Sequence, residues 1–429
     1  MSIYYYSELV FTDGQFAPAY IEVEGDEIIS LSSDLPPSGA TIVDYGSDAI
    51  FPGAVNTHTH SFQSLRRGCV DGKPLEEWLR AIYSAAQEYG EAECYLGGVV
   101  SFAEMLRSGT TTVADFFYLN GRGNNNCIAV MRAAEDLGIR LVMGRTFMDA
   151  AWGGTASRET LDEATTRFEQ LQMEFDGNNL LSVSPAPHSI YGATRPLIEA
   201  AYQQAKRTGT RWYMHLADSK TSAEKIAFEY GKRSVELLQE WGLLDASFVG
   251  IHAMWLSDAE IDLLSSNDAS ISHNPASNMI LGERIINLPE FWDHGIGVGL
   301  GTDGAASNNA LNLFRDVRLA SLAQKLRAQD PTAVNSNQMT RLITEDGGSV
   351  LGLPIGKLKA GFKADFIVLD TLDVSLQPIS ALTSNIIHSM SERAIKDVFC
   401  GGQKVVENGE LVRMEYKKIC KDLHGLLDS

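Results

Sequence analysis

Short apolar runs alternate with amphipathic stretches through the middle of the chain. The segments between the runs carry apolar residues at helical spacing, and several end at a glycine, the usual stop signal of a helix. Strands that alternate with helices are typical of βαβ units, so eight such runs predict a (β/α)8 TIM barrel, with a doubly wound parallel sheet as the alternative. The eight runs are "DAIFPGAVNTH", "GTTTVADFF", "IRLVMGRTF", "LLSVSPAPH", "TRWYMHLAD", "SFVGIHAM", "ASISHNP" and "IGVGLGTDG".

The two ends of the chain follow a different pattern, in which short β-like runs surround tight turns. Turn signals stand at Gly25-Asp26 near the N-terminus, and at Gly401-Gly402 and Asn408-Gly409 near the C-terminus. Because both ends share this pattern, we expect them to build one small β domain together.

Composition and charge narrow the class of protein. With 44% apolar and 21% charged residues, the 429-residue chain has the composition of a soluble globular protein. Its net charge of −20 argues against nucleic acid and against an acidic membrane surface as partners. The five cysteines are scattered, and the sequence has no signal peptide and no apolar run of membrane-spanning length. We expect a cytoplasmic enzyme that acts on a small molecule.

Polar residues follow the apolar runs at the points where strands should end. In a barrel of this kind, functional residues gather at the C-terminal ends of the strands. Six of the nine histidines occupy such positions, which favours a shared rim over independent loop contacts. The residues concerned are His58, His60, His188, His215, His252, His273 and Asp303.

Four of these residues form a candidate metal site. His58 and His60 are alternate residues of an extended strand, so both imidazoles project from one face. His215 and Asp303 complete a set of three nitrogens and one oxygen that suits Zn²⁺ or Fe²⁺ and leaves room for water. A bound metal ion lowers the pKa of its water to about 7, which makes hydroxide at neutral pH. We predict one divalent metal ion, most simply Zn²⁺.

Two further residues are candidates for proton transfer and charge stabilisation. Asp218, three residues after His215, is the candidate proton shuttle, with a structural role as the alternative. His252 is the candidate partner that orients the hydroxide or holds developing charge.

At these residues the sequence resembles the amidohydrolase superfamily. It is most similar to the single-metal branch that includes the S-adenosylhomocysteine/methylthioadenosine, guanine and 8-oxoguanine deaminases and the triazine hydrolases. The resemblance covers nearly the whole chain. It is carried by "PGAVNTHTHSFQSLRRG", "LRSGTTTVADF", "APHSIYG", "MHLADS", "IHAMWL", "SHNPASNM", "LGTDGAASNN" and "GKLKAGFKADFIVLD".

The resemblance implies a fold and a number of metal ions, and the sequence departs from the family pattern at one residue. It implies a barrel hydrolase domain at residues 53–359 and a composite β-sandwich domain at residues 1–52 and 360–429. Dinuclear members bridge two metals with a modified lysine, and residues 141–205 contain no lysine, so a single metal is favoured. Family deaminases generally carry glutamate where this chain has Asp218, whose reach is shorter by roughly 1.5 Å.

Four residues are candidate substrate contacts. Gln63 and Trp78 follow the first strand, where this branch places loop residues over the substrate, while Arg145 and His188 end the third and fourth strands. An aromatic ring, a guanidinium and an imidazole suit a flat, nitrogen-rich heterocycle. Two alternatives stay open: Trp78 as a core anchor of its helix, and Arg145 as the partner of a loop carboxylate.

The motifs disagree about the substrate itself. "LGTDGAASNN" most resembles the adenosyl-substrate deaminases, yet Gln87 stands where those enzymes carry an acidic ribose-binding residue. "GIRLVMGRTFM" is more similar to the free-base and triazine enzymes. The candidates therefore include purines, pterins, adenosyl nucleosides and triazines.

Three functions are compatible with this sequence. The leading hypothesis is a metal-dependent hydrolytic deaminase, an aminohydrolase that releases ammonia from an amino-substituted N-heterocycle. A second is a dehalogenating or cyclic amide- or imine-opening amidohydrolase. A third is a non-catalytic metal-binding relative, which the retention of all four ligand candidates and His252 disfavours. Homo-oligomerisation is expected only because it is common among soluble enzymes.

Overall fold

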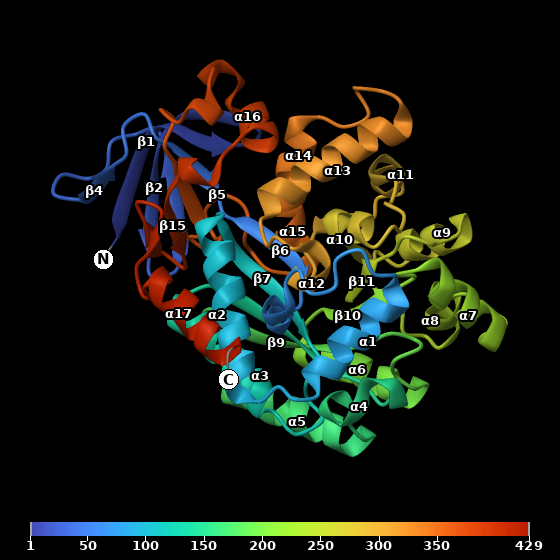
Figure 1. The fold of residues 1–429 in the computed structure, drawn as a ribbon. Helices are drawn as coiled ribbons and strands as arrows, with labels where there is room; N and C mark the ends of the chain where they lie inside the picture. The colour runs from blue at the N-terminus through green and yellow to red at the C-terminus, as the bar shows by residue number, and fades with distance from the viewer. Residues whose placement is uncertain (1, 428–429) are drawn as a thin grey trace.

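Strands from both ends of the chain hydrogen-bond into one nine-stranded sheet in the computed structural model, which describes residues 2–427 (Figure 1). The strand order is β17-β16-β15-β14-β5-β1-β2-β3, with β4 paired to β1. The strands are β1 (Ile3–Thr12), β2 (Gln15–Glu24), β3 (Glu27–Ser32), β4 (Thr41–Asp44), β5 (Ala49–Pro52), β14 (Phe366–Leu369), β15 (Ile395–Cys400), β16 (Gln403–Glu407) and β17 (Glu410–Leu411).

The three predicted turns connect neighbouring strands of this sheet, as expected. Asn408 and Gly409 join β16 to β17 with φ angles of 50° and 79°, the left-handed conformation that a tight hairpin requires. The two ends of the chain meet where β14 pairs antiparallel with β5. Aromatic side chains from both ends then share one small core, in which the ring of Tyr5 lies 5.2 Å from those of Phe366 and Phe399.

The middle of the chain forms two four-stranded parallel sheets, and each of the eight predicted runs contributes one strand to them; the first run also contains β5. Nearly every strand residue is buried, as expected for parallel strands that are covered on both faces. The first sheet contains β6 (Ala54–Thr59), β7 (Thr110–Phe117), β8 (Arg140–Phe147) and β9 (Leu181–Pro187). The second contains β10 (Trp212–Leu216), β11 (Phe248–His252), β12 (Ser270–His273) and β13 (Gly297–Leu300).

The strand pairing departs from the single closed barrel that the sequence predicts. The first sheet ends at β9, where the N–H of His188 donates to Phe147 of β8, so the nitrogen of Pro187 faces the opposite side. Pro185 and Pro187 have no N–H to donate toward β10, and one rim bond, from His215 N to His188 O at 3.1 Å, spans this join.

Side chains replace strand pairing at the other join, between β13 and β6. Asn56 Nδ2 donates to Thr302 Oγ1 at 2.8 Å, and Thr59 Oγ1 donates to the Asp303 carbonyl at 2.8 Å. The N–H of Asp303 donates to His58 O at 2.9 Å. These bonds hold the last strand beside the first at the end where the histidines lie.

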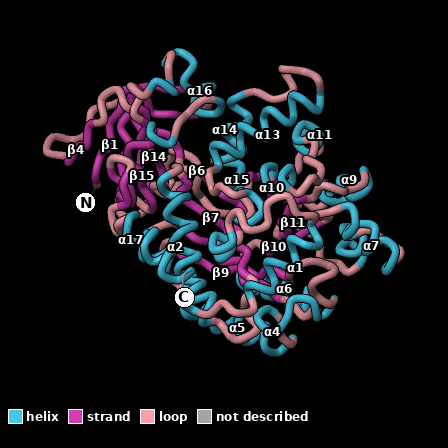
Figure 2. Tube along the Cα trace, in the orientation of Figure 1, coloured by secondary structure: helices cyan, strands magenta, loops and turns pink. Residues whose placement is uncertain are grey.

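Helices surround the two parallel sheets, as Figure 2 shows, and two of them, α1 and α2, lie between β6 and β7. The break between them lies at Gly90, whose N–H donates to the Glu93 carboxylate at 2.8 Å and so begins the second helix. Within residues 2–427 no helix is long and apolar enough to cross a membrane. The helices are α1 (Leu75–Ala86), α2 (Glu91–Arg107), α3 (Asn125–Leu137), α4 (Gly154–Ser157), α5 (Leu161–Glu174), α6 (Arg195–Thr208), α7 (Lys220–Tyr230), α8 (Ser234–Glu240), α9 (Asp258–Ser266), α10 (Pro275–Ile280), α11 (Leu288–Asp293), α12 (Ala305–Asn308), α13 (Leu313–Ala328), α14 (Ser336–Ile343), α15 (Glu345–Leu351), α16 (Leu382–His388) and α17 (Tyr416–Leu427).

Candidate active site

Four histidines and an aspartate converge at the C-terminal ends of the parallel strands. His58 lies on β6, and His60 follows the end of that strand, while His215 and His252 lie on β10 and β11. Their ligand atoms form two overlapping groups, His58 with His60 and His215, and His58 with His252 and Asp303. Within each group the atoms lie within 4.8 Å of one another. The arrangement can hold a metal ion.

Backbone hydrogen bonds orient two of the imidazoles toward the centre of the cluster. Nδ1 of His60 donates to the Phe116 carbonyl at 2.6 Å, and Nδ1 of His215 donates to the His188 carbonyl at 3.0 Å. Each bond leaves the Nε2 lone pair free, which is the usual arrangement around a metal-binding histidine.

One buried nitrogen in the cluster has no hydrogen-bond partner. Nε2 of His58 is shielded from solvent and lies 3.4 Å from Oδ1 of Asp303, while Nε2 of His60 lies 3.5 Å from the same oxygen. A buried polar atom without a partner is costly, and a cation between these atoms would satisfy it. The donor set therefore fits a divalent metal ion.

Burial and charge set the ionisation states that metal binding requires. Burial lowers the pKa of His60 to about 3 and lowers the pKa of His215 well below its ordinary value. Burial would raise the pKa of Asp303, but the close imidazoles of His58, His60 and His252 hold that pKa well below the ordinary value. The site thus offers neutral imidazoles and a carboxylate, the forms that bind metal.

Asp218 is held by two hydroxyl groups beside the cluster. Tyr191 donates to its Oδ2, and Ser222, in the first turn of α7, donates to its Oδ1. Asp218 lines the same pocket as His215 and Asp303. The structure therefore brings the predicted proton shuttle to the predicted metal site.

His252 is held by an asparagine on α10, the short helix that follows the next strand. Nδ1 of His252 lies 3.0 Å from Oδ1 of Asn278, which makes it the donor in that hydrogen bond. His252 and Asp303 both have positive φ angles, 72° and 60°, an uncommon conformation for these residue types that clusters at functional sites.

Three of the four predicted substrate contacts line the pocket: Gln63, Trp78 and His188. Nε2 of Gln63 donates to the Tyr118 hydroxyl at 3.1 Å, and a β-carbon at Gly304 would stand 2.1 Å from Oε1 of Gln63, so any larger residue there would displace the Gln63 amide. Both ring nitrogens of His188 have hydroxyl partners at 2.9 Å, from Tyr83 and Ser189.

Trp78 combines a place in the pocket wall with the role of core anchor. The residue is 8% exposed and its indole N–H donates to the Ala306 carbonyl at 3.0 Å. This bond fastens α1 to α12, the short helix after β13. Helix α1 contributes four of the lining side chains and closes over a cavity of about 70 Å³.

Arg145 was predicted at the rim, and its placement corrects that expectation. Its guanidinium is fully buried and makes a two-pronged ion pair with the loop carboxylate of Glu159, at 2.7 and 3.0 Å. Nε donates to Asn124 at 3.1 Å, so no edge of the guanidinium is left for a ligand. Arg145 does not line the pocket, because Glu159 holds it elsewhere. His273 ends β12 as predicted but also lies outside the lining.

Sequence reasoning missed several polar residues of this site, among them Tyr118, Tyr191, Ser222 and Asn278. Tyr191 stands three residues after His188 in "APHSIYG", and Asn278 closes "SHNPASN", so both lie in motifs that had drawn attention for other residues. Tyr118 lies just beyond the end of β7, and Ser222 lies on α7. These residues belong to the site through hydrogen bonds to residues that are brought close only in the folded chain.

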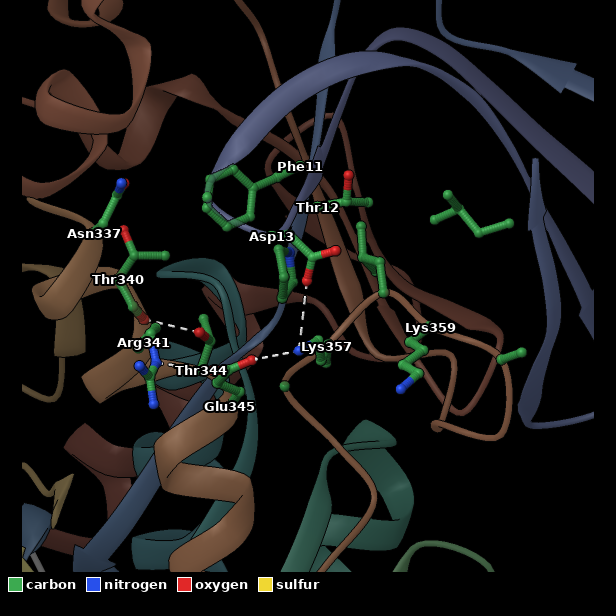
Figure 3. Close-up of a pocket in the computed structure, with 16 residues that line it drawn as sticks. Phe11, Thr12, Asp13, Asn337, Thr340, Arg341, Thr344, Glu345, Lys357 and Lys359 are labelled. Atoms are coloured by element: carbon green, nitrogen blue, oxygen red, sulfur yellow. Dashed lines mark hydrogen bonds and ion pairs between the residues drawn. The ribbon is translucent and has the colours of Figure 1, made fainter. Parts of the chain in front are cut away.

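A larger cavity lies at the other end of the strands, near Pro52, where β6 is about to begin. Its volume is about 660 Å³. Three of its charged groups pair with one another: Figure 3 shows Lys357 between Asp13 and Glu345, at 3.6 and 2.9 Å. His58 and His60 lie at the opposite end of β6, so we assign the chemistry to the smaller pocket.

Comparison with known proteins agrees with this geometry. The profile of the Amidohydrolase family matches residues 49–405. The chain is 34% identical to a 5'-deoxyadenosine deaminase of Methanopyrus kandleri, over 87% of this chain and 85% of that one. It is 29% identical to a 5-methylthioadenosine/S-adenosylhomocysteine deaminase of Pyrococcus abyssi, over 95% and 94%. The chain belongs to the amidohydrolase family, and it is a hydrolase of C–N bonds other than peptide bonds.

Solved structures share the fold over almost the entire chain. An adenosine deaminase from Xanthomonas campestris with bound zinc superposes with a TM-score of 0.89 at 26% identity, covering 99% of this chain and 98% of that one. The atrazine chlorohydrolase TrzN from Arthrobacter aurescens TC1, complexed with zinc, superposes with a TM-score of 0.91 at 24% identity, covering 99% and 100%. The second likeness speaks for the fold alone.

Proposed function

We propose that this chain is a metal-dependent hydrolytic deaminase that releases ammonia from an amino-substituted N-heterocycle. The observation that carries the proposal is the convergence of His58, His60, His215 and Asp303 at a pocket that also holds Asp218 and His252. The relatives named as deaminases of adenosyl nucleosides support the reaction class. The reaction replaces the ring amino group by the oxygen of water.

His58, His60, His215 and Asp303 would hold one divalent ion. Zinc is the first choice, because a structural neighbour at 26% identity contains it and because histidine and carboxylate donors suit it. When bound, such an ion lowers the pKa of a water molecule to about 7 and so supplies the nucleophile.

Asp218 moves the protons of the reaction. Its carboxylate takes a proton from the attacking water, passes it to a ring nitrogen, and later delivers a proton to the departing ammonia. Tyr191 and Ser222 hold the carboxylate in place during these transfers. His252, fixed through Nδ1 by Asn278, presents its other nitrogen to the charge that develops at the attacked carbon.

Gln63, Trp78 and His188 form the substrate-binding wall. The cavity is far smaller than the roughly 300–1,000 Å³ of typical ligand clefts. Helix α1 must therefore move outward to admit a heterocycle, and its return excludes water during the reaction.

The fold assignment carries three further proposals. Contacts between β9 and β10 and between β13 and β6 support a closed (β/α)8 barrel built from the two four-stranded sheets. Residues 1–52 and 360–429 form the composite β-sandwich domain, and residues 53–359 form the barrel. Homo-oligomeric assembly stays a prediction.

The test combines metal analysis with an ammonia assay. We expect one zinc or iron per chain by plasma mass spectrometry, and ammonia from one class among purines, adenosyl nucleosides, pterins, pyrimidines and triazines. Metal without ammonia would overturn the deaminase assignment. Release of halide or of a ring-opened acid in its place would identify the alternative amidohydrolase activity.

A further inference from the structure

No described side chain of the catalytic pocket carries a permanent positive charge. Sixteen described side chains line it, and none is lysine or arginine. Asp218 and Asp303 both line it, and their two negative charges would balance a bound divalent cation. Nothing in the described lining is left to neutralise a negatively charged substrate.

Three basic residues close to the lining in sequence face elsewhere. Lys220 is 61% exposed beside Glu224, and the guanidinium of Arg284 lies over the Trp255 ring at 3.8 Å. Arg80 is exposed on α1, turned away from the face that carries Trp78 and Tyr83 into the pocket. Arg145, which lies on a strand of the barrel, is fully engaged by Glu159.

Apolar side chains and neutral amides make up much of the remaining wall. Leu79 and Leu281 lie beside Trp78 in one apolar cluster and line the pocket. The unpartnered polar atoms are uncharged: Oε1 of Gln63 and Nδ2 of Asn278 are both buried without a hydrogen-bond partner. One accepts and one donates, which suits the edge of a neutral heterocycle.

We infer that this pocket selects an uncharged aminoheterocycle, with at most an apolar tail, and rejects substrates that carry a carboxylate or phosphate. The inference rests on the proposed deaminase function and specifies its substrate class. An anionic group brought into the pocket would lose its hydration and meet leucine side chains and carboxylates instead of a cation. Gln87 offers no polar group to a ligand, because its amide nitrogen already donates to the carbonyls of Tyr83 and Gly153.

The first experiment compares adenosyl nucleosides that differ in their tails. Metal-replete enzyme is assayed for ammonia with 5'-deoxyadenosine, 5'-methylthioadenosine, S-adenosylhomocysteine and adenosine 5'-monophosphate. We expect kcat/KM for the first two nucleosides, which are uncharged, to exceed that for zwitterionic S-adenosylhomocysteine and for the anionic monophosphate at least about a hundredfold. 5'-Phenylthioadenosine, bulky but neutral, separates charge from size and should stay within about tenfold of 5'-methylthioadenosine.

The outcomes separate the two proposals. Equal kcat/KM for S-adenosylhomocysteine and 5'-methylthioadenosine would overturn the selection of neutral substrates and leave the deaminase function standing. Rejection of the neutral phenyl compound to the same extent as S-adenosylhomocysteine and the monophosphate would show that size, not charge, is selected. Ammonia from none of these nucleosides, nor from the neutral purines, pterins, pyrimidines and triazines, would overturn the function itself.

A gain-of-function variant adds the missing cation. Leu281→Arg should raise the kcat/KM ratio of S-adenosylhomocysteine to 5'-methylthioadenosine at least about tenfold, because it places a guanidinium beside the tail. Leu281→Gln is the matched uncharged control and should leave the ratio unchanged. Met254→Arg repeats the test from another wall of the pocket if the first variant folds poorly. An unchanged ratio in two folded arginine variants would contradict the inference.

Discussion

The phenolic hydroxyl of Tyr191 donates a hydrogen bond to Oδ2 of Asp218, across 27 residues of sequence. Burial, reinforced by this carboxylate, raises the pKa of Tyr191 well above its ordinary value, so the phenol stays protonated and remains a donor. Ser222 supplies the second donor to the same carboxylate. Two hydroxyl donors therefore hold the Asp218 carboxylate in the pocket wall, although this side chain is shorter than a glutamate.

Replacement of Tyr191 by phenylalanine should lower kcat and leave KM within about twofold. Loss of one hydrogen bond to a charged acceptor costs about 1.5–3 kcal/mol, which corresponds to a fall of about 10- to 100-fold in kcat. Steady-state kinetics on the substrate identified by the ammonia assay measure this. The matched control is Tyr202→Phe, which removes a tyrosine–aspartate hydrogen bond, to Asp245, away from the pocket lining. A rise in KM alone would assign Tyr191 to substrate binding.

Asp218→Asn should lower kcat about 10²- to 10⁴-fold, the usual contribution of a proton-transferring side chain. Metal content should not change, because Asp218 is not in the candidate ligand groups. Asp218→Glu keeps a carboxylate and should retain more activity than the asparagine variant. Wild-type kcat in a metal-replete asparagine variant would remove the proton-transfer role.

The strands and the strand-end histidines could be predicted because both depend on local pattern. Alternate residues of a strand share a face, so His58 and His60 had to project together wherever the strand lay. The division into two sheets was harder to predict from the sequence. Pro185 and Pro187 in the fourth run do indicate it, because proline has no N–H to donate to a neighbouring strand.

Partners distant in sequence could not be predicted in this way. The position of Arg145 at a strand end is correct, but its long side chain turns toward Glu159, which lies on a loop with no periodic pattern. Tyr191 and Ser222 likewise acquire their place only through Asp218. The roles assigned to the site residues stay predictions until these variants are measured.

Arg145→Met should destabilise the protein without changing substrate recognition. Removal of one partner of a buried ion pair costs about 3–5 kcal/mol. We expect the lower end of this range, about 3 kcal/mol, because Arg167 still pairs with Glu159 at 2.9 Å. Urea unfolding measures the loss. Arg195→Met, which breaks an exposed pair with Glu199, is the control and should cost about 0.5 kcal/mol or less. A large rise in KM in folded Arg145→Met would restore the substrate-binding interpretation.

Removal of the metal by a chelator should abolish activity and lower the melting temperature. A ligand that binds only the folded state stabilises it, so added zinc should restore both quantities. His58→Ala should lower metal content from one ion per chain to about a tenth or less, because both candidate ligand groups contain His58. His294→Ala, at the exposed end of α11, should keep full metal content. Retention of metal in His58→Ala would contradict the assigned ligand set.

Asp115 should make the metal-free protein less stable as the pH rises from about 4 to about 7. Burial raises the pKa of this carboxyl to about 7, against the opposing effect of two hydrogen bonds from Ser61. The folded state therefore binds more protons than the unfolded state between the ordinary value of 3.8 and about 7. The free energy of unfolding falls through this window by up to about 4 kcal/mol.

Asp115→Asn keeps a neutral side chain of the same shape and should lose this dependence. The measurement is the difference in unfolding free energy between wild type and Asp115→Asn, from urea denaturation between pH 4 and 8. As the pH rises, the unfolding free energy of wild type should fall relative to that of Asp115→Asn, because only wild type carries a buried carboxyl at this position that must ionise. Asp176→Asn, on the exposed turn after α5, should give a flat difference. Parallel curves for wild type and Asp115→Asn would show that Asp115 is already ionised in the folded protein at pH 4.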